Sequence, residues 1–187
     1  VWDGDVNPQG AGAVYSFQPA SGVTIRTAGV YSIIDEASAG PDSDMLGAQV
    51  QLTIEPHPDW RFSAAVGYYN YSLANTTNAN AGDFRDNLQN GLGGYLSDFD
   101  LFNVLASASY LGLGEHWPVT ITEDYVKNFG AAVSDDEGFG TEISLGRTAT
   151  QGDWRFAYGY SQAEIDAVLG AFSHDNLGIA TNYQSHL

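Results

Sequence analysis

The sequence predicts an all-β protein: an antiparallel, up-and-down transmembrane β-barrel with about nine strands visible, which belong to a larger barrel. Apolar and polar residues alternate at the strand period of two, in segments of about ten residues. Strands of soluble proteins usually run ~5–6 residues, so this length favours a membrane barrel. Short turns and long polar loops also alternate along the chain, which is typical of outer-membrane barrels.

The composition excludes several other classes of protein. The 187 residues include 6 Lys+Arg and 23 Asp+Glu, and a net charge of −17 argues against a nucleic-acid partner, because phosphate binding needs clustered basic side chains. The chain is too apolar (43%) and too aromatic (13%) for a disordered acidic tail. With no cysteine it has no disulfide, thiolate zinc site or cysteine nucleophile. No run approaches the ~18 apolar residues of a membrane-spanning helix.

Nine strands are expected from the alternation. The pattern is strict at the end of the chain, where Trp154, Phe156 and Tyr158 alternate with Arg155 and Ala157. It is also clear from Leu46 to Ile54 and from Val119 to Asp124, and it is weaker in the remaining six segments. In order, the expected strands are 11–18, 22–34, 46–54, 60–72, 99–110, 119–124, 138–148, 154–161 and 178–187.

The connections between these strands differ in length and composition. An up-and-down meander places alternate connections at opposite ends, so this order predicts short turns at one end and long loops at the other. Ser161 and Glu164 have capping-box spacing before a helical apolar period, which we interpret as a loop packed on its own apolar side chains. The short turns are 19–21, 55–59, 111–116 and 149–152, and the long loops are 35–43, 73–98, 127–137 and 162–177.

One tetrapeptide occurs twice, as Asp59–Phe62 and as Asp153–Phe156, each time just after a short turn. In a barrel, Asp closes the turn, Trp lies in the interfacial aromatic belt, Arg points into the lumen and Phe faces lipid. Trp60, Trp117 and Trp154 are therefore predicted to form an interfacial aromatic belt.

The polar face of each strand defines a predicted pore lining. Arg147 does not fit, because it shares the parity of the apolar face, and we expect it to reach the interface near a turn. Ser107 and Ser144 fall on the polar face as well. The predicted pore-lining residues are Arg26, Gln49, Gln51, Arg61, Asn103, Thr120, Thr122, Asp124, Glu142 and Arg155.

Three segments resemble the bacterial porin family of outer-membrane β-barrels: Val1–Gly10, Trp117–Asn128 and Ala163–Ala167. The resemblance covers most of the chain in widely spaced patches and implies an aqueous pore without naming a solute. Members of that family are longer, with a signal peptide, more strands and commonly a terminal aromatic residue. We therefore expect these residues to belong to a larger polypeptide, or the missing edges to be paired by other chains, because single-chain bacterial barrels have an even number of strands.

Acidic residues are concentrated in or beside the long connections, which predicts a negative outer mouth and a mild cation preference. No cofactor is expected; Ca²⁺ or Mg²⁺ at the acidic loops is a metal hypothesis, set against simple solvation of the carboxylates. The four histidines are scattered, which argues against zinc. Sixteen acidic residues are in this set: 35, 36, 42, 44, 83, 86, 98, 100, 123, 124, 135, 136, 137, 164, 166 and 175.

No catalytic site is predicted. The chain has no Gly-x-Ser-x-Gly motif, and Ser173, His174 and Asp175 are sequence neighbours, which geometry rarely makes into a relay.

The expected function is passive diffusion of small hydrophilic solutes across the bacterial outer membrane, with outer-membrane lipid and lipopolysaccharide as partners and homo-oligomerisation left open. Loop 73–98 is the candidate constriction, through Phe84, Leu88, Leu92 and Tyr95. Two alternatives remain: a secreted acidic β-sandwich that binds Ca²⁺ or carbohydrate, and a non-conducting structural or adhesive surface barrel.

Overall fold

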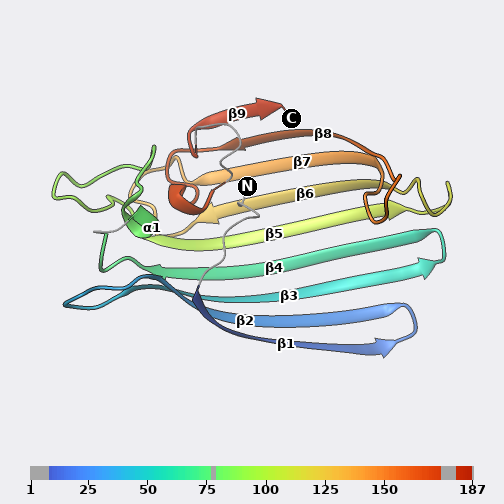
Figure 1. Ribbon diagram of the computed structural model, residues 1–187, viewed down its shortest axis with the longest axis horizontal. Coiled ribbons are helices and arrows are strands. Elements are labelled where there is room, and N and C mark those ends of the chain that lie inside the picture. Colours follow the sequence, from blue (N-terminus) through green and yellow to red (C-terminus); the bar gives the residue numbers. More distant parts are fainter. Residues whose placement is uncertain (1–8, 77–78, 174–179, 187) are drawn as a thin grey trace.

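The computed structural model describes residues 9–76, 79–173 and 180–186. In this part of the chain, nine antiparallel strands form one sheet in sequence order, so the prediction of an all-β meander is confirmed (Figure 1). The sheet is open, with β1 and β9 as its two edges. The elements are β1 (Gln9–Ala20), β2 (Val23–Asp35), β3 (Ser43–His57), β4 (Trp60–Ser72), α1 (Ala79–Gly82), β5 (Phe99–Tyr110), β6 (Val119–Asn128), β7 (Glu137–Gly146), β8 (Arg155–Ala163), η1 (Gly170–Phe172) and β9 (Tyr183–His186).

The connections sort by length to the two ends of the sheet. The shorter turns β1–β2, β3–β4, β5–β6 and β7–β8 lie together at one end, on the right in Figure 1, and the long loops lie at the other. We call these the turn end and the loop end. Strands β1 to β8 contain nine to 15 residues, which is long for a soluble sheet.

The two faces of the sheet differ in what covers them. Residues paired directly across strands point to the same face, so Arg26, Gln51 and Asp124 share one face, and Val50 and Phe62 lie on the other. The long loops pack against the first, which we call the loop face. Within the described residues nothing packs over the second, the open face.

The hydrophobic core lies between the loop face and the inward-folded loops, near the loop end. Phe99, Leu101 and Val126 are fully buried there against Val168 and Leu169 of the β8–β9 loop. Burial of these side chains stabilises the packing by roughly 25 cal/mol per Å² of apolar surface, and it holds the β4–β5 and β8–β9 loops on the sheet. The other buried members are Ile34, Tyr71 and Ala81.

Several boundaries differ from the predictions. β6 continues to Asn128, so position 127 lies in a strand rather than in a loop. The helical period after Ser161 gives only the three-residue turn η1. β7 ends at Gly146, whose φ of +89° is a left-handed conformation that favours glycine, so Arg147 lies in the turn and not on the lipid-facing parity. Within the described residues no helix is long and apolar enough to cross a membrane.

Candidate functional site

All ten predicted pore-lining residues lie on the loop face, where the cross-strand pairing aligns them. Thr122 is paired with Ser107 and Glu142, and Asn103 lies in the row of Gln49. The arginines lie near the turn end, as their positions after short turns predicted. The others are placed by the same pairing: Arg26, Gln51, Arg61, Thr120, Asp124 and Arg155.

Hydrogen bonds and ion pairs join these side chains across neighbouring strands. The Asn103 amide donates to Asp124 Oδ1 at 2.6 Å. Arg61 Nε lies 2.6 Å from Glu55 Oε1, and Arg155 pairs with Glu142. Because two of the three guanidinium groups are neutralised by a neighbouring carboxylate, this part of the face is polar but carries little net charge.

Sequence reasoning missed a row of hydroxyl groups on the same face. Thr24, Thr53 and Ser63 are paired in line with Ser107 and Thr122, so the row crosses five adjacent strands. Thr53 Oγ1 and Ser63 Oγ are 3.3 Å apart. Only the cross-strand register could have revealed this row, because each hydroxyl alone looks like an ordinary polar strand position.

A buried polar network joins the long loops to one another over the loop face. The Asp166 carboxylate is fully buried and accepts hydrogen bonds from Ser97 Oγ at 2.6 Å and from the Leu88 backbone amide at 3.0 Å. Asn87 Nδ2 donates to Asp166 Oδ1 at 3.2 Å and to the Val168 carbonyl at 3.0 Å. These bonds satisfy both carboxylate oxygens, which is required for a charge in a buried position.

Asn128 at the end of β6 ties this network to the sheet. Its Nδ2 donates to the backbone carbonyls of Asp98 and Asp166, both at 2.9 Å. Its Oδ1 accepts from the backbone amides of Asp100 and Gly130, both at 3.0 Å. One side chain therefore fixes three long connections relative to β6.

The described part of the predicted constriction loop 73–98, which is 73–76 and 79–98, does fold onto the loop face, but not through all the expected residues. The Tyr95 ring packs against Phe84 and Phe99, with centroids 4.6 and 5.3 Å away, and Tyr95 Oη donates to the Ala81 carbonyl at 2.7 Å. Burial raises the pKa of the Tyr95 hydroxyl. Leu92 is 93% exposed, so the prediction that it points inward was wrong.

The open face is apolar and bordered by aromatic side chains toward both ends. Trp60 and Tyr110 lie near the turn end, and Tyr68 and Phe102 lie toward the loop end. Trp60 and Tyr68 are eight positions apart in the numbering; at ~3.4 Å per residue this is about 27 Å along the strand. The side chains exposed between the borders include Val50, Leu52, Phe62, Val66, Ile121 and Ile143.

The repeated tetrapeptide has the same arrangement in both copies. Trp60 stacks on Phe62, with centroids 5.8 Å apart, and Trp154 stacks on Phe156 at 6.4 Å. The arginine that follows each Trp lies on the loop face and pairs with a glutamate. Trp60 and Trp154 border the turn end, and Trp117 lies beside Trp154 in a hollow of about 340 Å³ between two turns.

Asp153 clamps two turns together at this end. Its side chain is 3% exposed, and its carboxylate lies 2.8 Å from His116 Nδ1 and 3.2 Å from Arg147 Nε. It also accepts from the Thr150 backbone amide at 2.9 Å. The hydrogen bond with His116, and then those from the turn amides, hold the Asp153 pKa well below its usual value. Arg147 therefore lies in the β7–β8 turn, where it pairs with Asp153.

The acidic residues do not all belong to a solvated mouth. Asp35 is buried and accepts the Ala81 backbone amide at 2.8 Å, and Asp166 is buried in the network above. Glu123 and Asp124 lie within β6, and position 175 lies outside the described residues. In the described part of the chain, no three Asp, Glu or His side chains converge closely enough to hold a metal ion. Exposed carboxylates that do lie at the loop end include Glu36, Asp83, Asp86, Asp98, Asp135 and Glu137.

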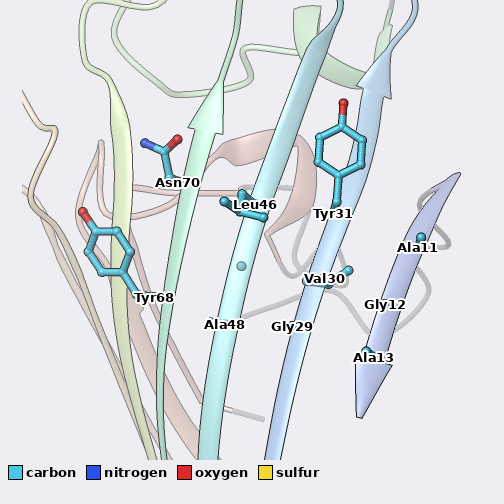
Figure 2. Close-up of a pocket in the computed structure, with 11 residues that line it drawn as sticks. Ala11, Gly12, Ala13, Gly29, Val30, Tyr31, Leu46, Ala48, Tyr68 and Asn70 are labelled. Atoms are coloured by element: carbon cyan, nitrogen blue, oxygen red, sulfur yellow. The ribbon is translucent and has the colours of Figure 1, made fainter.

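A shallow hollow of about 760 Å³ lies on the open face over β1 to β4 (Figure 2). The hollow forms because the residues that line it are small, and Tyr68 lies at its edge. The small residues are Ala11, Ala13, Gly29 and Ala48. Its apolar lining makes it continuous with the rest of the open face.

Comparison with protein-family models, with curated proteins and with solved structures finds no match to this chain.

Proposed function

We propose that this chain forms part of an outer-membrane porin, a passive diffusion channel for small hydrophilic solutes with a mild preference for cations. The observation that carries the proposal is the distribution of side chains over the two faces. The open face exposes an apolar band, with Val50 53% and Phe156 58% exposed, and aromatic residues border it at both ends. An exposed apolar surface of this kind needs a hydrocarbon or protein partner, and about 27 Å of strand tilted by ~40° would give a band about 20 Å tall, close to the ~25 Å band of outer-membrane barrels.

The loop face supports the second half of the proposal. Its hydroxyl, amide and paired charged groups would keep passing solutes hydrated in a water-filled lumen. Selectivity would then depend on the width of the pore and on the charges that line it. The exposed carboxylates at the loop end, together with a net charge of −17, favour cations at that entrance.

The barrel itself is part of the proposal. Nine strands leave β1 and β9 as open edges, and unpaired backbone groups in lipid cost several kcal/mol each. Closure needs partner strands at both edges, from a longer polypeptide or from other chains. The folded-in segments 79–98 and 164–173 would then narrow the lumen near the loop end.

Two alternatives predict different behaviour. A β-sandwich needs a second sheet over the open face, and the described residues provide one sheet only. A non-conducting surface barrel shares the apolar band and differs only in the lack of a conducting path.

Reconstitution distinguishes these functions. A porin partitions into detergent or lipid, shows heat-modifiable mobility on a denaturing gel and gives discrete conductance steps in planar bilayers. A membrane-inserted, heat-modifiable protein without conductance supports the structural barrel. A monomer that stays soluble without detergent contradicts both barrel functions.

A further inference from the structure

The carboxylate of Glu123 lies in the middle of the apolar band on the open face. By cross-strand pairing its neighbours on that face are Ala106 of β5 and Thr141 of β7. Ile121 and Tyr125 flank it along β6. Its carboxylate accepts a hydrogen bond from Thr141 Oγ1 at 2.8 Å. The four open-face positions of β4 from Phe62 to Tyr68 carry no carboxylate: they are Phe62, Ala64, Val66 and Tyr68.

A carboxylate at this place does not fit a lipid-facing surface. Ionisable side chains in hydrocarbon are expensive, and they are normally found facing a protein or a water-filled cavity. Glu123 points away from the loop face. Cross-strand pairing places it in line with Leu52 and Ala64, whose side chains lie on the open face. Among the described residues, the Thr141 hydroxyl is the hydrogen-bond donor found at the Glu123 carboxylate, which leaves acceptor capacity for a partner on this face.

The polar character continues toward β9. Thr141 is paired with Tyr160, which is paired with His186, and Gln162 is paired with Gln184, all on the open face. Tyr158 Oη contacts His186 Nδ1 at 2.7 Å, and within the described residues the other ring nitrogen makes no hydrogen bond. We define the polar patch as Glu123, Thr141, Tyr160, Gln162, Gln184 and His186.

The polar patch is complementary to itself. Glu123 supplies a charged acceptor on β6, while Gln184 and His186 on β9 supply donors three strands away. In an isologous contact each residue meets a different residue of the same patch, so the acceptor of one copy faces the donors of the other. The same row on β3 to β5 is Leu52, Ala64 and Ala106, which offers no polar complement.

We propose that the polar patch is the contact surface between two copies of this chain within the membrane, with Glu123 of each copy facing Gln184 and His186 of the partner subunit. This inference rests on the proposed membrane location of the open face, and it places the remaining band, on β2 to β5, against lipid. Thr141 lies near the centre of the patch, and so near the two-fold axis.

Cysteine cross-linking tests the contact directly, because the natural chain has no cysteine. Thr141→Cys should form a disulfide-linked dimer in lipid vesicles on mild oxidation. Ala64→Cys is the matched control, since it lies on the same face and in the same row, three strands away. The dimer yield of Thr141→Cys should exceed that of Ala64→Cys at least tenfold. Equal yields, or no dimer from Thr141→Cys, would overturn the proposal.

A second variant tests the charge. Glu123→Leu should shift the mass measured by light scattering in detergent from dimer toward monomer, whereas Ile121→Leu on the same strand should leave it unchanged. A dimer unaffected by Glu123→Leu contradicts the proposed contact. Conductance is recorded on the same preparations. A conducting monomer overturns the dimer contact and supports the porin function. A cross-linked dimer without conductance supports the dimer contact and contradicts the porin function.

Discussion

Ser97 Oγ donates a 2.6 Å hydrogen bond to Asp166 Oδ2, and this bond joins the β4–β5 loop to the β8–β9 loop over the loop face. The two residues are 69 positions apart in the chain, and both side chains are buried. The bond matters because a buried carboxylate persists only when its oxygens are satisfied, so the two loops hold each other in place.

Replacing Asp166 should therefore release both loops. Asp166→Asn keeps the volume but leaves either the Ser97 hydroxyl or the Leu88 amide without its acceptor, at a cost of about 2 kcal/mol. Hydrogen exchange should accelerate in 84–98 and in 164–173 while the strands stay protected. Asp83→Asn is the control, because Asp83 is exposed and pairs with Arg85 outside the network. Unchanged exchange in both loops would show that the network does not hold them.

Deletion of residues 80–95 tests whether the folded-in loop narrows the channel. Removing Tyr95 and its contacts with Phe84 and Phe99 opens the loop face near the loop end, so single-channel conductance should increase. Conductance equal to that of the full chain would count against a constriction at this loop. Heat-modifiable mobility of the deletion variant serves as the check that it is folded.

Arg26 should influence ion selectivity more than the other arginines on the loop face. It is exposed, and among the described residues no carboxylate pairs with it. A unit charge ~4 Å from a passing ion contributes on the order of 1 kcal/mol in water, so Arg26→Gln should raise cation permeability and lower anion permeability by up to about fivefold each. The control is the double variant Arg61→Gln, Glu55→Gln, which removes a neutral pair. Reversal potentials in a salt gradient measure both; equal shifts would argue against a lining role for Arg26.

The open face should not tolerate a charge in the middle of the band. Val66 is 49% exposed there, and Val66→Lys should cost about 2–4 kcal/mol of membrane stability. Ser63→Lys, on the loop face of the same strand, should insert normally because its ammonium group stays in water. The fraction folded in lipid vesicles, read from heat-modifiable mobility, compares the two. Normal insertion of Val66→Lys would argue against lipid contact at β4.

The turn clamp should weaken in acid. The Asp153 pKa is lowered in the folded protein, so the stability it contributes is present above the ordinary carboxyl pKa of 3.8 and is lost as the pH falls toward the folded value. Asp153→Asn should therefore lower the melting temperature more between pH 5 and 8 than below about pH 4. Asp59→Asn is the control, because Asp59 lies 3.5 Å from His57 and, within the part of the chain that the structure describes, its side chain accepts no turn amide. A pH-independent difference would contradict the role of the ionised carboxylate.

The prediction of strands and faces succeeded because alternation is a local property. Gln49 and Val50 had to point to opposite sides wherever the strand lay, and the same holds for Arg155 and Phe156. The face of Arg147 was not predicted correctly for the same reason. Its parity was assigned as if β7 continued to 148, whereas β7 ends at Gly146, which has a left-handed conformation and immediately precedes Arg147. The loop carboxylates were judged together as a solvated group, and sequence spacing had no means to separate buried Asp166 from exposed Asp135.

The sequence by itself determined the number of strands, their approximate limits and which side chains share a face, since side chains one residue apart on a strand always diverge. Only the tertiary structure decided that Asn128 and Asp166 hold the long loops on the sheet, and that Glu123 lies between Ala106 and Thr141 of the neighbouring strands. These relationships join residues far apart in the chain, and they depend on register and loop packing, which a local period of two does not specify.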